Sequence, residues 1–216
     1  MLDLSAMGKR SYKQNCALAR AGDVVGERWT LLLVRDLLVS PRRFNELLNS
    51  LKGIGTNLLA ARLKDLEAAD IIERRDGGGT VRVYALTERG QALEPAVLAL
   101  IRWGLTRGPE SRVGDQHRDD WDLLALKALF QPSRAADLSI CVQFDAPEFE
   151  GWARIEDQHM SIGVGNIHDA EIGINGTIKD LFLGSSSAAE LLTKVFQVSQ
   201  GELLDIFATI PERGNG

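Results

Sequence analysis

The sequence predicts an α+β protein built from two units. Its 216 residues suffice for two domains of about 100 residues each. Residues 1–110 carry 17 Lys and Arg against 13 Asp and Glu, whereas residues 111–216 carry 8 against 17. Apolar residues recur with helical spacing through the first half and alternate with polar residues in much of the second. We therefore expect a basic, mainly helical front unit and an acidic rear unit, with one sheet and helices on a face of it.

The composition excludes several classes of protein. The hydrophobic and charged fractions, 44% and 25%, are those of an ordinary globular chain. The longest apolar stretch is interrupted by Arg35 and Asp36, so no membrane-spanning helix is predicted. No signal-peptide pattern follows Asp3, and we expect a cytoplasmic protein without a membrane partner. Cys16 and Cys141 lie in different halves and do not suggest a disulfide framework.

The front half begins with helices. The stretch 13–40 carries an apolar stripe and ends before Pro41, which cannot continue a helix interior; the stripe consists of Trp29, Leu32, Leu33 and Leu37. A short helix is predicted over 43–51, and the glycines of KGIG (52–55) separate it from a helix over 56–71. Two helices joined by a short glycine-containing turn are typical of a helix-turn-helix. In the second helix, the spacing assigns the core side to Leu59, Leu63 and Leu66.

A β-hairpin is predicted next. Val81 and Val83 alternate with polar neighbours, ERR (73–75) forms the other arm, and DGGG (76–79) forms the tip. The three glycines are not a phosphate-binding loop, because such a loop leads into a helix and here a strand follows. A helix-turn-helix followed by a basic hairpin is the winged-helix arrangement, and an apolar helix over 91–104 completes the unit.

Residues 9–105 resemble the HxlR family of bacterial winged-helix transcriptional regulators. The matching blocks are RSYKQNC (10–16), GERWTLLLVRDLL (26–38), PRRFNEL (41–47), GIGTNLLAARLKDLE (53–67), ADIIERR (69–75), YALTERG (84–90) and LIRWG (100–104). The resemblance implies a homodimer that binds a two-fold double-stranded DNA operator, and it favours repression over activation. It also implies a dimer interface from the helix over 17–25 together with Leu100 and Trp103, although Trp103 serves equally well as intradomain core.

In a winged helix, the second helix of the pair enters the major groove and the hairpin contacts the backbone. Asn57 suits a base edge, with a helix cap as the alternative. Arg62 and Lys64 suit phosphates, although Arg62 can instead pair with Asp65 or Glu67. Gly55 and Ala60 replace serines common in the family, which leaves the base-reading residue open. The predicted DNA-binding residues are Arg42, Arg43, Thr56, Asn57, Arg62, Lys64, Arg74, Arg75, Thr80 and Arg82.

Cys16 falls where several members of that family carry a cysteine that senses oxidants or electrophiles. Such a thiol needs a depressed pKa, to which Lys13 and Arg20 can contribute. The alternative is a small packing thiol.

The rear half predicts a helix at its start, alternating strands with a hairpin around Asp157 and Gln158, and then helices with one short strand over 196–200. In this order of elements it resembles the sterol-carrier type of fold. We place the front domain at 1–108, a polar linker at 109–120 and the rear domain at 121–216. The resemblance rests on the order of elements and on residues 174–207, and it implies a small apolar ligand in a tunnel. The predicted lining residues are Phe144, Met160, Ile162, Ile174, Leu181, Phe182, Phe196, Leu203 and Phe207, with plain core packing as the alternative. A second reading of the whole chain is a lipid or apolar-ligand carrier in which DNA binding is residual.

No catalytic, cofactor or metal site is predicted, and the chain is not expected to be an enzyme. The three histidines lack helical i, i+4 spacing and cysteine partners; they are His117, His159 and His168. A run of like charges beside the linker, read as solvated surface, consists of Asp119, Asp120 and Asp122.

Overall fold

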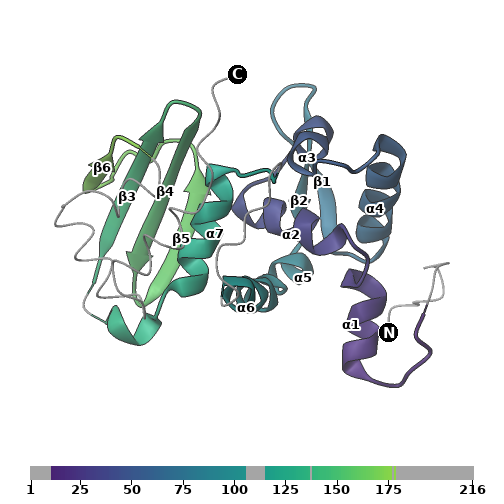
Figure 1. Ribbon diagram of the computed structural model, residues 1–216. Helices are drawn as coiled ribbons and strands as arrows, with labels where there is room; N and C mark the ends of the chain where they lie inside the picture. Colours follow the sequence, from purple (N-terminus) through teal and green to yellow (C-terminus); the bar gives the residue numbers. More distant parts are fainter. Residues whose placement is uncertain (1–10, 106–114, 137, 177, 179–216) are drawn as a thin grey trace. The chain divides into compact units, whose positions relative to one another are not determined.

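The computed structural model describes residues 11–105, 115–136, 138–176 and 178 (Figure 1). The chain divides into two compact units, Met1–Val97 and Leu98–Gly216. Among the described residues, no helix is both long and apolar enough to cross a membrane.

The front unit opens with two helices where one apolar stripe was predicted. Helix α1 (Ala17–Val25) ends at Gly26, and α2 (Thr30–Val39) starts after Trp29. Leu33 and Leu37 are buried as expected, but Leu32 is 36% exposed. Val34 is buried in its place, because Leu37 lies four residues after Leu33 and three after Val34 and so borders both on the buried side of the helix.

The predicted helix-turn-helix is present. Helix α3 (Phe44–Ser50) is followed by a turn in which Gly53 adopts a positive φ of 96°, and then by α4 (Thr56–Ala68). Leu59, Leu63 and Leu66 of α4 are all at most 2% exposed, which confirms the predicted core face of this helix.

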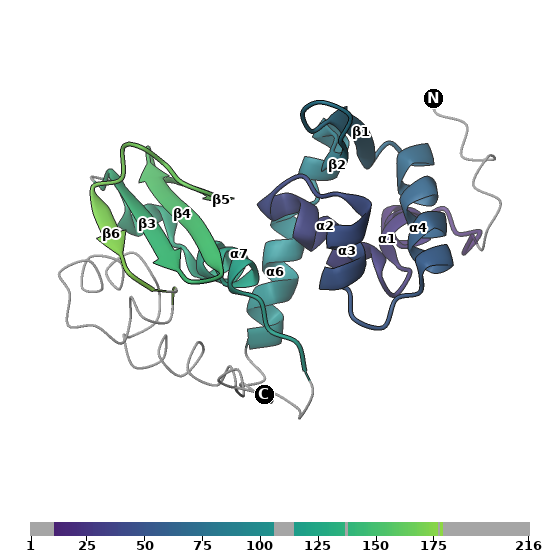
Figure 2. The same ribbon diagram turned by 90° about the horizontal axis from the view of Figure 1, so that it is seen from above.

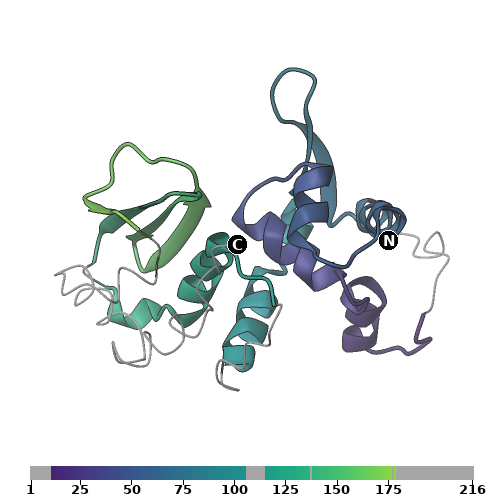
Figure 3. The same ribbon diagram turned by 45° about the horizontal axis from the view of Figure 1, so that its top comes forward.

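The predicted hairpin is also present. Strands β1 (Ile72–Asp76) and β2 (Arg82–Leu86) pair antiparallel, and Figure 3 shows the connection between them projecting away from the helices. The tip is closed by a hydrogen bond of 2.9 Å from the Gly77 N–H to the Val81 carbonyl. Gly78 and Gly79 turn the chain at positive φ, which a residue with a side chain rarely adopts.

Two helices complete the front of the chain. The short α5 (Glu88–Gln91) begins at Thr87, whose side chain accepts a hydrogen bond from the Gly90 N–H. Helix α6 (Glu94–Leu105) then spans the boundary between the two units.

Within its described residues, the rear unit has a four-stranded sheet with a helix against it, which agrees with the predicted α+β arrangement. Helix α7 (Asp119–Leu129) and a 3₁₀ turn, η2 (Pro132–Arg134), lead into the strands, which are β3 (Ile140–Ala146), β4 (Phe149–Glu156), β5 (His159–Val164) and β6 (Ile172–Ile174). The strand order is β5-β4-β3-β6, with β6 parallel to β3 and the other pairs antiparallel. Helix α7 packs on β4 and β5 (Figure 2).

The elements predicted beyond residue 178, which are helices and one short strand, lie outside the described residues. The same holds for five of the predicted lining residues, which are Leu181, Phe182, Phe196, Leu203 and Phe207. The likeness of residues 121–216 to sterol-carrier proteins therefore stays a prediction.

Candidate nucleic-acid interface

The outer face of α4 is polar and exposed. Thr56, Asn57 and Lys64 all lie exposed there, on the opposite side from the three buried leucines. Gly55 is the N-cap residue and brings no side-chain cap. Asn57 is therefore not the cap of this helix, and its amide lies in the first turn, where it is open to a partner.

The start of α3 is tied to the base of the wing. Arg42 exchanges two backbone hydrogen bonds with Tyr84 of β2, at 3.0 and 2.7 Å. Arg43 is the N-cap residue of α3, and its N–H donates to the Glu46 carboxylate at 2.6 Å. Two consecutive cationic residues are thereby held beside the hairpin.

Arg62 pairs with acidic residues, which was the alternative to a phosphate contact predicted from the sequence. Its guanidinium pairs with Asp65 at 2.9 Å and with Glu27 at 3.0 Å. Its side chain is only 14% exposed. Arg62 is thus engaged within the front unit, and it contributes less to an accessible surface than the other cations.

The arms of the wing carry exposed arginines, each beside an acidic residue. Arg74 also lies over the ring of Tyr84, at 5.3 Å from its centroid. Thr80 is exposed next to the tip. Exposed ion pairs contribute little stability, so phosphate oxygens can replace the acidic partners at small cost. The pairs are Arg74 with Glu67, Arg75 with Glu73 and Arg82 with Asp76.

Cys16 is exposed at the N-cap position of α1. Hydrogen bonds from the backbone N–H groups of Ala19 and Leu18 lower the pKa of its thiol below the usual value. The backbone at the helix start accounts for this shift, rather than Lys13 and Arg20 as expected from the sequence. The thiol is therefore accessible and inclined towards the reactive thiolate form.

Four of the predicted lining residues lie in the described sheet. Phe144 and Met160 are buried, whereas Ile162 and Ile174 are half-buried. The strand register places all four on one face. Phe144 pairs directly with Ile174, and the pairings of β3 with β4 and of β4 with β5 put Met160 and Ile162 on the same side of the sheet. The face is apolar, as both a ligand tunnel and ordinary packing require.

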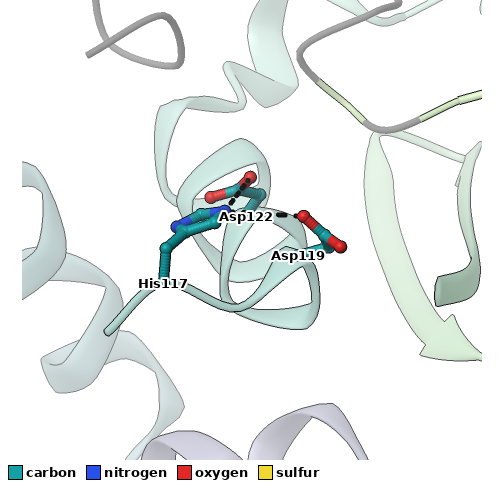
Figure 4. A group of neighbouring side chains, drawn as sticks. All are labelled: His117, Asp119 and Asp122. Atoms are coloured by element: carbon teal, nitrogen blue, oxygen red, sulfur yellow. Dashed lines mark ion pairs between the residues drawn. The ribbon is translucent and has the colours of Figure 1, made fainter. Parts of the chain in front are cut away.

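The structure also brings together a cluster that the sequence did not predict. His117, Asp119 and Asp122 meet at the start of α7 (Figure 4). Burial opposes protonation of His117, but the two carboxylates outweigh it and raise its pKa to about 9. The expectation of a solvated run was wrong, because Asp120 and Asp122 are 5% and 7% exposed.

The signal for this cluster was the spacing HxDxxD over residues 117–122. This spacing contains neither a histidine pair one helical turn apart nor a cysteine, which are the patterns from which metal ligands were expected. Two carboxylates three residues apart share a helix face, and the preceding histidine folds back over them.

A helix-turn-helix with an exposed polar second helix and an arginine-rich wing defines a winged-helix DNA-binding protein. A sequence profile of the HxlR-like helix-turn-helix family matches residues 24–112. The HTH-type transcriptional regulator YodB of Bacillus subtilis (strain 168) is 38% identical over 85 residues, which cover 38% of this chain and 76% of that protein. The chain belongs to the HxlR family and is a DNA-binding transcriptional regulator.

Two further comparisons cover the same part of the chain. The uncharacterized HTH-type transcriptional regulator Rv3095 of Mycobacterium tuberculosis (strain ATCC 25618 / H37Rv) is 37% identical over 90 residues, covering 41% of this chain and 56% of that protein. The crystal structure of quinone-bound YodB from B. subtilis shares 34% identity at a TM-score of 0.37, covering 41% of this chain and 96% of that one.

Proposed function

We propose that the regulator reads its operator with α4 in the major groove and grips the backbone with the wing. The observation that carries this proposal is the division of α4 into a buried leucine face and an exposed face with Asn57 and Lys64. Asn57 is the base-reading residue of the proposal, because an amide bonds adenine with two hydrogen bonds. Lys64 lies on the same face and contacts a phosphate in this proposal, because its ammonium group donates hydrogen bonds but cannot accept one as an amide does.

The phosphate contacts come from two places. Arg42 and Arg43 lie at the start of α3, and the wing contributes Arg74, Arg75 and Arg82. The wing arginines now pair with Glu73 and Asp76, which are exposed, and with Glu67 of α4, and the more highly charged DNA backbone displaces these carboxylates. Arg62 is omitted from this set, because it is held by Glu27 and Asp65.

We further propose a homodimer with a two-fold operator, acting as a repressor in the cytoplasm. Helix α1 exposes Leu18 (79%), and α6 exposes Leu100 (49%) and Trp103 (61%). Large apolar side chains at such exposure are typical of surfaces that a partner covers. A dimer also doubles the number of cations that face one DNA duplex.

The test uses the full chain and a duplex from upstream of its own gene, with binding followed by fluorescence anisotropy. We expect an affinity that falls steeply as salt rises, because bound phosphates release counterions. Asn57→Ala should weaken the specific duplex by about 1–3 kcal/mol and leave a scrambled duplex unchanged. Equal binding of both duplexes by the wild type would refute sequence-specific recognition.

A second input is proposed at Cys16, on the observation that its exposed thiol has a lowered pKa. An electrophile would add to the thiolate at the start of α1, beside the proposed dimer helix. A quinone is the probe of choice, because the relative YodB has a quinone-bound structure. Loss of DNA binding after quinone treatment, prevented by Cys16→Ser, is the expected result; equal loss in both proteins would contradict it.

The rear unit is proposed to bind a small apolar ligand on the sheet face with Phe144 and Met160. In the alternative function, a carrier, this ligand is the main cargo and DNA binding is residual. Organic extraction of the purified full chain and mass spectrometry of the extract test the ligand. Steep salt-dependent binding to the duplex would exclude the carrier alternative.

A further inference from the structure

Three ligand-bearing side chains converge at the start of α7 (Figure 4). His117 comes from the segment before the helix, and Asp119 and Asp122 come from its first turn. One ligand atom from each lies within 4.8 Å of the other two. Asp122 is buried and the other two residues are half-buried, so water does not freely solvate this group.

The distances within the group are longer than those of strong charged hydrogen bonds. His117 Nε2 lies 3.3 Å from an Asp122 carboxylate oxygen and 3.5 Å from one of Asp119. Charge-assisted N–H···O bonds measure about 2.7–2.9 Å. Two ligand atoms held about 2.0–2.1 Å from one tetrahedral Zn²⁺ lie about 3.3 Å apart. The two separations from His117 Nε2 are close to this value, and all three ligand atoms lie within 4.8 Å of one another.

Two carboxylate oxygens face one imidazole nitrogen. Nε2 carries at most one hydrogen, which points at one acceptor at a time, whereas two carboxylate oxygens face this nitrogen. A cation between the three atoms is coordinated by all of them. A divalent ion displaces the proton from His117 and then neutralises the two negative charges of Asp119 and Asp122.

Arg118, next to His117 in the sequence, forms a two-pronged contact with Asp120, at 3.0 Å to each of its oxygens. The N-terminal end of α7 carries a positive partial charge that opposes a cation, and the acidic residues of the first turn offset it.

We propose that His117, Asp119 and Asp122 bind one divalent transition-metal ion per chain, with Zn²⁺ as the best-fitting ion. One nitrogen and two oxygens suit Zn²⁺, and three protein ligands leave a position for water or an exogenous ligand. The ion ties the segment before α7 to the helix and stabilises the rear unit by mass action. This inference stands apart from DNA recognition, because none of its ligands belongs to the proposed DNA-binding set.

The experiment uses the full chain, stripped with EDTA and dialysed, in a Cys16→Ser background that removes the exposed thiol as a competing ligand. Zn²⁺ is titrated by isothermal calorimetry, and Co²⁺ absorption spectra report the coordination. We expect one ion per chain and a rise in Tm on adding Zn²⁺. No binding of either ion by this protein would overturn the proposal.

Three variants and one control locate the ion. His117→Gln, Asp119→Asn and Asp122→Asn should each weaken Zn²⁺ binding by more than about tenfold, since each removes one of three ligands. His168→Gln removes an exposed histidine beside Asp169 in the same unit and should bind as the parent does. If the Asp122→Asn variant does not fold, the variants at the two half-buried positions, His117 and Asp119, still test the site. Unchanged affinity in His117→Gln and Asp119→Asn would refute the site.

Discussion

Arg62 of α4 lies 3.0 Å from the Glu27 carboxylate, and this ion pair joins the proposed recognition helix to the segment before α2. The same guanidinium reaches Asp65 one helical turn further on, at 2.9 Å. An arginine so placed fixes how α4 lies on the front unit, while cations at the rim of the unit remain available to DNA.

Replacing Arg62 by Ala should therefore affect stability more than DNA binding. We expect the free energy of unfolding to fall by about 1 kcal/mol, because two pairs are lost but their carboxylates are more than a third exposed and screened. Urea unfolding measures this loss. The slope of the logarithm of the binding constant against the logarithm of salt concentration should match that of the wild type. A slope smaller by about one would show that Arg62 contacts a phosphate.

The wing arginines should behave in the opposite way. Arg75→Ala and Arg82→Ala should each weaken binding to specific and scrambled duplexes alike and lower the salt slope by about one. Their stability should change little, because their ion pairs are exposed. Arg89→Ala on α5 is the matched control, an exposed arginine outside the proposed set. A similar slope for all four proteins would exclude the wing from the interface.

The core face of α4 offers a test of the helix-turn-helix packing. Leu63 is 1% exposed, and Leu63→Ala should cost about 2–5 kcal/mol of unfolding free energy, through lost burial and the cavity left behind. Leu58 on the same helix is 39% exposed, and Leu58→Ala should cost less than about 1 kcal/mol. Chemical denaturation of both variants measures the difference, and equal losses would contradict the assigned orientation of α4.

The reactivity of Cys16 should depend on pH in a shifted range. Because backbone N–H groups lower the pKa of its thiol, the thiolate forms at a lower pH than in a free cysteine. Alkylation by iodoacetamide, followed by mass spectrometry across a pH series, should show half-maximal rate below that of a reference peptide. The buried Cys141 provides an internal comparison and should react slowly. A Cys16 midpoint at or above that of the peptide would exclude the shift.

Trp103 tests the proposed dimer. Trp103→Ala should raise the dimer dissociation constant by at least about tenfold, because exposed tryptophans that become buried contribute strongly to interfaces. Analytical ultracentrifugation over a concentration series measures it. Leu32→Ala on α2, a large apolar residue also at the surface, is the control. A monomeric wild-type protein would remove the basis of the two-fold operator.

Local patterns were sufficient for most of the front unit. The helical spacing of Leu59, Leu63 and Leu66 predicted the buried face of α4, and the change to alternation after Ile72 predicted the wing. In the rear unit, alternation also predicted the hairpin at Asp157 and Gln158, where both residues adopt positive φ. These features follow from contacts between residues close in the sequence, which periodicity reports directly.

The partners of charged side chains were not determined by such patterns. The sequence alone offered Arg62 a phosphate, Asp65 or Glu67, and the fold added Glu27, 35 residues away, as its second partner. The sequence likewise read Asp122 as solvated, whereas the structure buries it beside His117. Periodicity reports which face of an element is apolar, whereas the pairing of charges depends on where distant segments meet in space. The sequence thus determined the class of this protein and the buried face of α4, and the tertiary structure decided which acidic residues the arginines pair with and which carboxylates converge on one histidine.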